Sequence, residues 1–112
     1  MFDFEKLNVY NKAKAFNKTV YTLLSSNSCD RTTTDQLRRA SFSIMLNIAE
    51  GTGRQTQPDK KRFYTMSRGS VFECVAIMDY LKDIEEINQD EFDIYYAKLD
   101  ELSRMLYSLI KR

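Results

Sequence analysis

Two carboxylates in helix-periodic segments are the first residues to consider for chemistry. Glu50 lies three residues after Asn47, and Glu73 lies three residues after Ser70, so each pair shares one face of a helix. Facing carboxylates are an arrangement used for general acid and base catalysis. The same side chains can instead form a hydrogen-bonded network that fixes helix register, and we favour this structural role. Its predicted members are Ser43, Asn47, Glu50, Ser70 and Glu73.

The absence of histidine narrows the chemistry further. The 112 residues include no His, which removes Ser-His and Cys-His nucleophilic pairs and the commonest general base. Cys29 and Cys74 lack CxxC spacing and do not complete a four-ligand zinc site. We therefore expect a non-enzymatic protein with no catalytic residues, no metal and no cofactor. The weakest alternative is a metal-assisted nuclease that uses Glu50 and Glu73.

Positive charge is concentrated in the middle of the chain. The overall net charge is +1, but residues 31–71 carry eight Lys and Arg against three acids, whereas residues 72–112 carry five against ten. Several of these cations fall where helices are predicted to begin, and there they oppose the helix dipole. Basic residues at positions where acidic residues are preferred favour a function such as binding the phosphate backbone of RNA or DNA. A solvated basic face is nevertheless the commoner explanation. The candidate contacts are Arg38, Arg39, Arg54, Lys60, Lys61 and Arg62.

Four amphipathic segments must position these residues. Apolar residues at alternating spacings of four and three predict a helix over residues 5–24, followed by a polar linker over 25–32. Thr33 and Gln36 fit a capping box that opens the second helix. Gly51 and Gly53 are expected to end it in the left-handed conformation.

The third and fourth helices have their own start signals. Thr56, followed by Pro and Asp, predicts an N-cap for a third helix that runs to about Glu86. Gly69 lies inside this helix, and we expect a neighbouring backbone to approach it closely. Asn88 caps a fourth helix whose apolar residues continue to Leu109.

These elements predict a single all-α domain over residues 1–112, an antiparallel up-and-down four-helix bundle. The second helix is apolar over much of its circumference, which favours burial against another copy of the chain. No apolar run reaches the length of about 18 residues that a membrane span needs. The first residues lack a signal-peptide core, so we expect a cytoplasmic protein without membrane contact.

The central stretch resembles a known family. QLRRASFSIMLNIAEGTGR followed by KKRFYTMSRGSVFE resembles the four-helix-bundle proteins encoded in intervening sequences of bacterial ribosomal RNA. The opening FEKLNVYNKAKAF also resembles the family's first helix. Two stretches depart from the pattern: SSNSCDRTTT replaces a segment with Pro and acids, and Met66-Ser67-Arg68 precedes Gly69 where a small residue is usual. The matching positions are Gln36, Arg38, Arg39, Ala40, Ser43, Ile44, Asn47, Ile48, Ala49, Glu50, Gly51, Arg62, Phe63, Gly69, Ser70 and Glu73.

The resemblance implies more than the fold. It implies a ring of five copies. The family is also similar to the accessory variability determinant of retroelements, which is a basic barrel that binds nucleic acid and a reverse transcriptase. It carries over no catalytic residue. We therefore expect a homo-oligomer, most simply a homopentamer, that binds RNA or DNA through a basic surface of the second and third helices. The alternative is an oligomeric adaptor that binds another protein and no nucleic acid.

Overall fold

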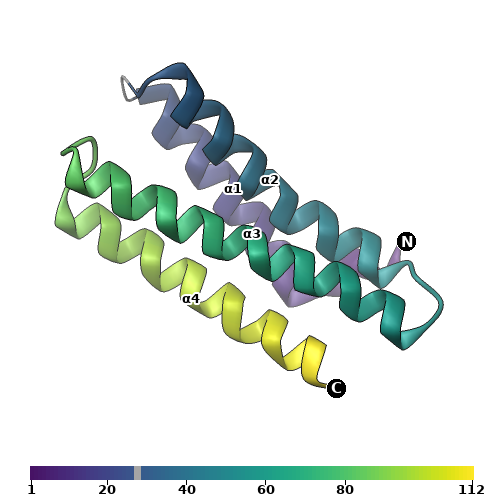
Figure 1. Cartoon of the computed structure of the whole chain (residues 1–112). Helices are drawn as coiled ribbons and strands as arrows, with labels where there is room; N and C mark the ends of the chain where they lie inside the picture. Colours follow the sequence, from purple (N-terminus) through teal and green to yellow (C-terminus); the bar gives the residue numbers. More distant parts are fainter. Residues whose placement is uncertain (27–28) are drawn as a thin grey trace.

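The computed structural model describes residues 1–26 and 29–112, and within these ranges it contains helices and no strand. Successive α-helices run in opposite directions (Figure 1). The prediction of an all-α four-helix bundle is confirmed. The elements in chain order are the 3-10 helix η1 (Asp3–Lys6), α1 (Asn8–Ser26), α2 (Arg31–Thr52), α3 (Gln57–Asp83) and α4 (Gln89–Lys111).

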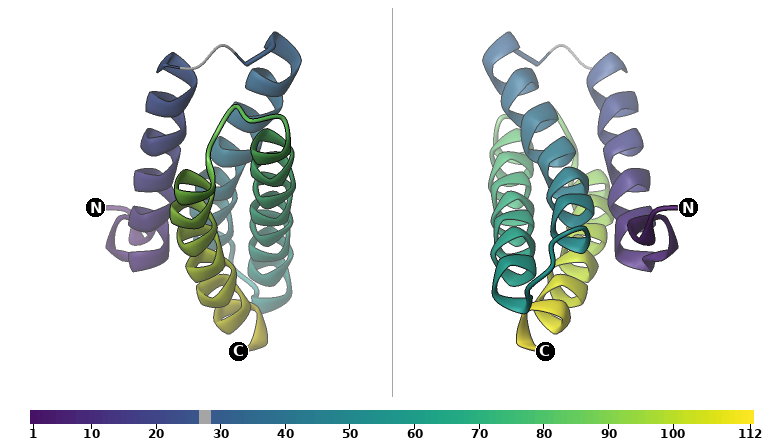
Figure 2. Two further views of the ribbon diagram at one scale, coloured as in Figure 1. Left: turned by 90° about the vertical axis from the view of Figure 1, so that its left-hand side faces the viewer. Right: turned by 90° about the vertical axis from the view of Figure 1, so that its right-hand side faces the viewer.

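The four α-helices pack unequally. The α2–α3 pair has the most extensive contact, followed by α3–α4 and α1–α2, whereas α1 contacts α4 only sparsely. Figure 2 shows the consequence, since α1 stands at the side of the bundle, away from α3. The α2–α3 pair is therefore the centre of the bundle, and α1 is held mainly by its contact with α2.

One apolar stripe from each helix forms the core. One buried cluster includes Phe16 and Val20 from α1, Ile44 from α2, Met78 from α3 and Leu102 from α4, and each of these side chains is at most 1% exposed. The stripes follow the helical periodicity of the sequence. Burying a side chain of this size contributes about 1.5–3 kcal/mol, so the stripes explain why the chain forms a bundle.

The start of α2 differs from its prediction. The helix begins at Arg31, and its N-cap is Asp30, whose carboxylate accepts a hydrogen bond from the Thr33 N–H at 2.8 Å. The capping box at Thr33 and Gln36 is therefore wrong, because an Asp three residues earlier already satisfies the free N–H groups. The predicted linker over 25–32 was also too long, and its residues 27–28 lie outside the described part of the chain.

The caps of α3 and α4 match their predictions. The Thr56 hydroxyl accepts a hydrogen bond from the Asp59 N–H, and Asn88 forms a capping box with Glu91. The helix α3 ends at Asp83, slightly before the predicted Glu86. The connection to α4 then passes through Glu85, which has a φ of 62°.

Glycine has different roles from those predicted. No glycine has a positive φ, and Gly53 follows α2 with a φ of −81°, so the left-handed ending is wrong. A Cβ at Gly51 would lie 2.9 Å from Cε1 of Tyr64, so the close approach occurs at Gly51. At Gly69 no atom lies within 4 Å of the Cβ position, so the approach predicted there is absent from the protomer.

Within residues 1–26 and 29–112, no helix is both long enough and apolar enough to cross a membrane.

Candidate functional site

Three members of the predicted polar network meet between α2 and α3. The Asn47 amide donates hydrogen bonds to the Ser43 carbonyl at 2.9 Å and to its hydroxyl at 2.8 Å. The Ser70 hydroxyl donates to the Ser43 hydroxyl at 3.0 Å. These contacts link the two helices at the middle of their lengths, as the structural interpretation requires.

The two carboxylates do not join this network. Glu50 is exposed and pairs with Arg54 at 2.5 Å, and Glu73 is exposed along α3. The prediction that they face each other inside the bundle is therefore wrong for the protomer. The physical reason is that an ionised carboxylate loses much hydration free energy on burial unless it is paired, whereas Glu50 reaches a cation one turn later at the surface.

Two buried hydroxyl groups were missed as network members. Ser67 is fully buried and donates to the Ile44 carbonyl at 2.7 Å, and Ser41 is fully buried and donates to Oδ1 of Asn17 at 2.9 Å. Both serines lie at helical spacing from the apolar residues of a buried stripe, and this spacing could have indicated that their hydroxyl groups are buried. Ser67 lies four residues before the buried Val71.

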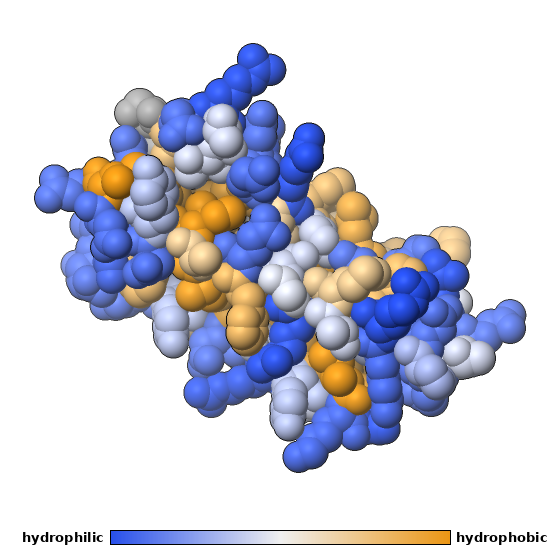
Figure 3. Space-filling model, in the orientation of Figure 1, coloured by the Kyte–Doolittle hydropathy of each residue, from blue (hydrophilic) through white to orange (hydrophobic). Residues whose placement is uncertain are grey.

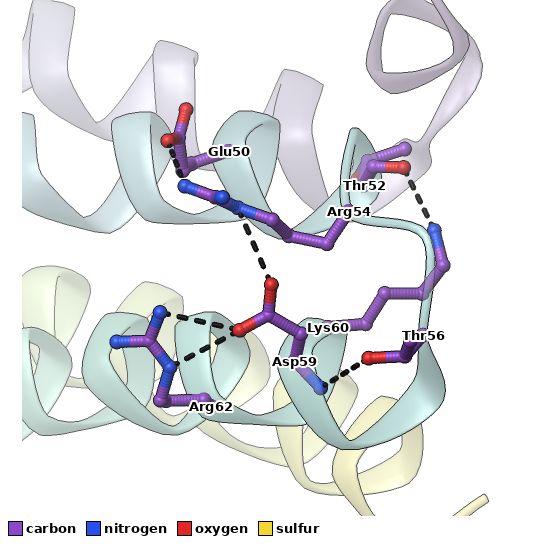
Figure 4. Close-up of polar contacts among 7 residues, drawn as sticks. All are labelled: Glu50, Thr52, Arg54, Thr56, Asp59, Lys60 and Arg62. Carbon is purple, nitrogen blue, oxygen red and sulfur yellow. Dashed lines mark hydrogen bonds and ion pairs between the residues drawn. The ribbon is translucent and has the colours of Figure 1, made fainter.

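The turn between α2 and α3 gathers several charges, which we call the turn cluster: Glu50, Arg54, Asp59, Lys60 and Arg62 (Figure 4). Arg54 contacts both acids, at 2.5 Å from Glu50 and 3.7 Å from Asp59. The Arg62 Nε donates to Asp59 at 3.2 Å. The guanidinium groups of Arg54 and Arg62 also lie 4.5 Å from the ring centroid of Phe63. The cluster is thus largely neutralised within the protomer.

The lysines of this region contact backbone oxygens. Lys60 Nζ donates to the Thr52 carbonyl at 2.8 Å, and Lys61 Nζ donates to the Arg112 carbonyl at 2.9 Å. A cation is favourable near the C-terminal end of a helix, and Thr52 ends α2. The position of Lys60 at the start of α3, which looked unfavourable in sequence, therefore has a structural explanation.

Arg38 and Arg39 lie elsewhere, about 20 Å along α2 from Arg54 at 1.5 Å per residue. Both are exposed, and the Arg38 guanidinium lies 5.4 Å from the ring centroid of Tyr21 on α1. Neither arginine has an ion pair among the described residues. They line a groove of about 290 Å³ between α1 and α2, together with Asn17, Tyr21, Ser41 and Phe42. We call this the α1–α2 groove.

A larger groove of about 540 Å³ runs between α3 and α4. Its central cation, Arg68, donates to the Ser103 carbonyl at 3.2 Å and hydroxyl at 3.1 Å. The guanidinium also lies near the rings of Phe72 and Tyr107, at 5.0 and 5.2 Å. The sequence prediction treated Arg68 only as a charge. The spacing of four residues to Phe72 on the same helix was an available signal, whereas the contact with Tyr107 depends on how α3 and α4 pack.

The predicted cations thus fall into two groups. Arg54, Lys60, Lys61 and Arg62 are each held by a partner in the protomer, and Arg38 and Arg39 flank an open groove. Within the described ranges there is no group of three or more His, Cys, Asp and Glu residues that could hold a metal ion.

The fold defines a four-helix-bundle protein, and comparison with known proteins places it further. The family model described as 23S rRNA-intervening sequence protein matches residues 5–108, so the chain belongs to this family. Among solved structures, the chain is similar to a protein of unknown function of the S23 ribosomal protein family from Bacteroides thetaiotaomicron, with a TM-score of 0.86 and 21% identity over 93% of this chain and 99% of that chain. A search of curated proteins gives no significant match.

Proposed function

We propose that this protein is a non-catalytic homo-oligomer that binds the backbone of RNA or DNA through basic side chains of α2 and α3. The observation that carries the proposal is the pair Arg38 and Arg39, which are exposed, adjacent and without a described ion pair. Unneutralised cations repeated around an oligomer attract a polyanion. The two free cysteines suit a reducing cytoplasm, where we place the protein.

Self-association is supported by the outward surface of α2 and α3, which we call the outer face and which consists of exposed residues: Leu46, Met66, Gly69, Glu73 and Tyr80. Leu46 is 47% exposed and Met66 is 41% exposed. Figure 3 looks onto α2, α3 and α4 and shows apolar patches within a polar surface. Apolar patches with a polar rim are typical of contacts between proteins. The family resemblance favours five copies, and a ring of that kind needs a head-to-tail contact.

Sedimentation velocity tests the self-association. The outer-face variant Leu46→Gln is expected to shift the sedimentation coefficient toward that of the protomer. The matched control is Ile94→Gln, since Ile94 is 56% exposed on α4 and lies outside the outer face. A wild-type chain that sediments as a protomer at all concentrations would overturn this part of the proposal.

Anisotropy titrations with labelled RNA and DNA at two salt concentrations test the binding. Each phosphate contact contributes about 0.7–0.9 to the slope of log affinity against log salt. The double variant Arg38→Ala/Arg39→Ala is expected to weaken binding and to reduce the slope by about 1.4–1.8. The matched control is Lys98→Ala/Lys111→Ala, which removes the same charge from α4. Absence of binding at low salt would overturn the proposal.

A second candidate is an oligomeric adaptor for another protein. The neutralised turn cluster favours it, because cations already paired within the protomer contribute little to phosphate binding. This candidate predicts an oligomer without nucleic-acid affinity. The four cations Arg54, Lys60, Lys61 and Arg62 remain predicted phosphate contacts of the first candidate, and alanine variants of Lys61 and Arg62 distinguish the two.

A further inference from the structure

The α1–α2 groove combines two cations with two exposed aromatic rings. Tyr21 is 62% exposed on α1, and Phe42 is 49% exposed on α2. Arg38 and Arg39 lie on the same groove, and none of the residues that line it is acidic. A side chain of each kind is common on a surface, but their convergence on one groove defines a ligand that is both anionic and flat.

The surroundings of the groove are also basic. The helix α1 contains three lysines and no acid. Lys14 and Lys18 are exposed and share a helical stripe with Tyr21, at spacings of four and three. The nearest acid along α2 is Asp35, one turn before Arg39, and it forms no ion pair with either arginine among the described contacts. The electrostatic preference is therefore for a negatively charged ligand.

The rings are arranged for stacking. The Arg38 guanidinium covers one side of the Tyr21 ring at 5.4 Å from its centroid. The large exposed fraction of Tyr21 leaves the rest of the ring open to solvent. Nucleobases stack on aromatic side chains whatever their sequence. In a duplex the faces of the bases are hidden within the helical stack, so such stacking requires an unpaired strand.

The groove also holds one oriented polar group. The buried Ser41 hydroxyl donates to Oδ1 of Asn17 at 2.9 Å, which fixes the amide. Its Nδ2 donor has no acceptor among the described residues. A fixed amide donor beside two rings can bond an acceptor on a base edge or a phosphate.

From these contacts we infer that the α1–α2 groove binds single-stranded nucleic acid, with phosphates on Arg38 and Arg39 and bases stacked on Tyr21 and Phe42. This inference rests on the proposed function and deepens it, because it replaces a general affinity for phosphate backbones with a preference for unpaired strands. The groove is separate from the turn cluster at the far end of α2 and from the outer face that we assign to contacts between copies.

Three fluorescent probes test the inference by anisotropy at low salt: a thymidine strand of about 15 nucleotides, which is within the usual site size, an abasic strand of equal length, and a duplex of equal length. The wild-type protein is expected to bind the thymidine strand about tenfold more tightly than the abasic strand, because only the former can stack. Tyr21→Leu and Phe42→Leu are each expected to weaken thymidine-strand binding about fivefold or more. Their duplex affinity should change less than twofold.

The control variant is Tyr96→Leu, which removes an exposed ring from α4, outside the α1–α2 groove and the outer face, and should leave all three affinities unchanged. Far-ultraviolet circular dichroism and sedimentation check the fold and assembly of each variant. Binding that is equal for thymidine and abasic strands, or unaffected by Tyr21→Leu, would overturn the groove assignment while the proposed function stands. A Tyr21→Leu variant that loses its oligomer would show a contact between copies and also overturn it. Failure of every probe to bind would overturn the proposed function itself.

Discussion

The Lys60 ammonium donates a hydrogen bond to the backbone carbonyl of Thr52 at 2.8 Å, so the first turn of α3 satisfies the last turn of α2. The last four carbonyls of a helix have no partner within the helix. A cation from the next helix both bonds one of them and interacts favourably with the negative end of the dipole. The hairpin thus uses a side chain of one helix to stabilise the end of the other.

Replacing Lys60 with Met should therefore destabilise the protein. Met keeps the length of the side chain and removes the donor, and the expected loss is about 1 kcal/mol. For a domain of this size the melting temperature should fall by about 4 °C. The control is Lys98→Met, since Lys98 is exposed and has no described ion pair. Equal melting temperatures for Lys60→Met and the wild type would contradict the structural role.

A larger residue at Gly51 should destabilise the protein. The Cβ position at Gly51 lies 2.9 Å from Cε1 of Tyr64 and 3.0 Å from Cβ of Phe63, so a methyl group forces the Tyr64 ring or the start of α3 to shift. We expect Gly51→Ala to destabilise the protein by about 1–3 kcal/mol, as overpacking usually does. At Gly53 the nearest atom is 3.6 Å away, which is an ordinary contact. Chemical denaturation of both variants measures the difference, and a Gly51→Ala variant as stable as Gly53→Ala would be inconsistent with the packing.

The fold was predictable because its signals are local. The buried stripe of Leu99, Leu102 and Leu106 follows helical spacing directly, and the caps at Thr56 and Asn88 need only three residues to recognise. The predicted start of α2 was wrong because Asp30 and Thr33 are both residues that can cap a helix. Which of them is the N-cap depends on the path of the chain before α2, and the sequence does not give that path.

The site was less predictable because its contacts cross between helices. Glu50 can meet Arg54 one turn later or turn inward, and both choices fit the same spacing. The contacts from Lys60 to Thr52 and from Arg38 to Tyr21 depend on the geometry of two helix pairs. Residue type and spacing identified the polar and basic residues, but packing decides which of them are neutralised.

The stability contributed by Asp30 should depend on pH. Hydrogen bonds from the backbone and then the hydroxyl of Thr33 lower the pKa of this carboxyl from its usual 3.8. A lowered pKa in the folded state means that the unfolded state binds the proton more readily, so the contribution is present above pH 3.8 and is lost as the pH falls through the folded value. The melting temperatures of Asp30→Asn and wild type should be measured between pH 2 and 7 and plotted against pH. The two curves should converge in acid, because Asn caps the helix without titrating. Parallel curves across this range would refute the prediction.

The two cysteines should differ in reactivity. Burial, with a further contribution from the charge of Glu73, raises the pKa of Cys74 to about 12. The thiolate is the reactive form, so a thiol reagent at pH 8 should modify the half-buried Cys29 first and reach Cys74 only when the protein unfolds. A Cys29→Ser variant should then react at the rate of unfolding, and in guanidinium it should show one thiol at once. Rapid labelling of native Cys29→Ser would contradict the burial of Cys74.

Gly69 offers a test in which the stability of the protomer and self-association move in opposite directions. Glycine inside a helix costs about 1 kcal/mol relative to Ala, and at Gly69 nothing within 4 Å opposes an added Cβ. Gly69→Ala should therefore stabilise the isolated protomer by about 0.5–1 kcal/mol. If the outer face contacts another copy, the larger Gly69→Gln should weaken the oligomer while it keeps most of this gain. Denaturation of dilute protein measures the first effect, and sedimentation at rising concentration measures the second. An unchanged oligomer in Gly69→Gln would place the contact between copies on another face.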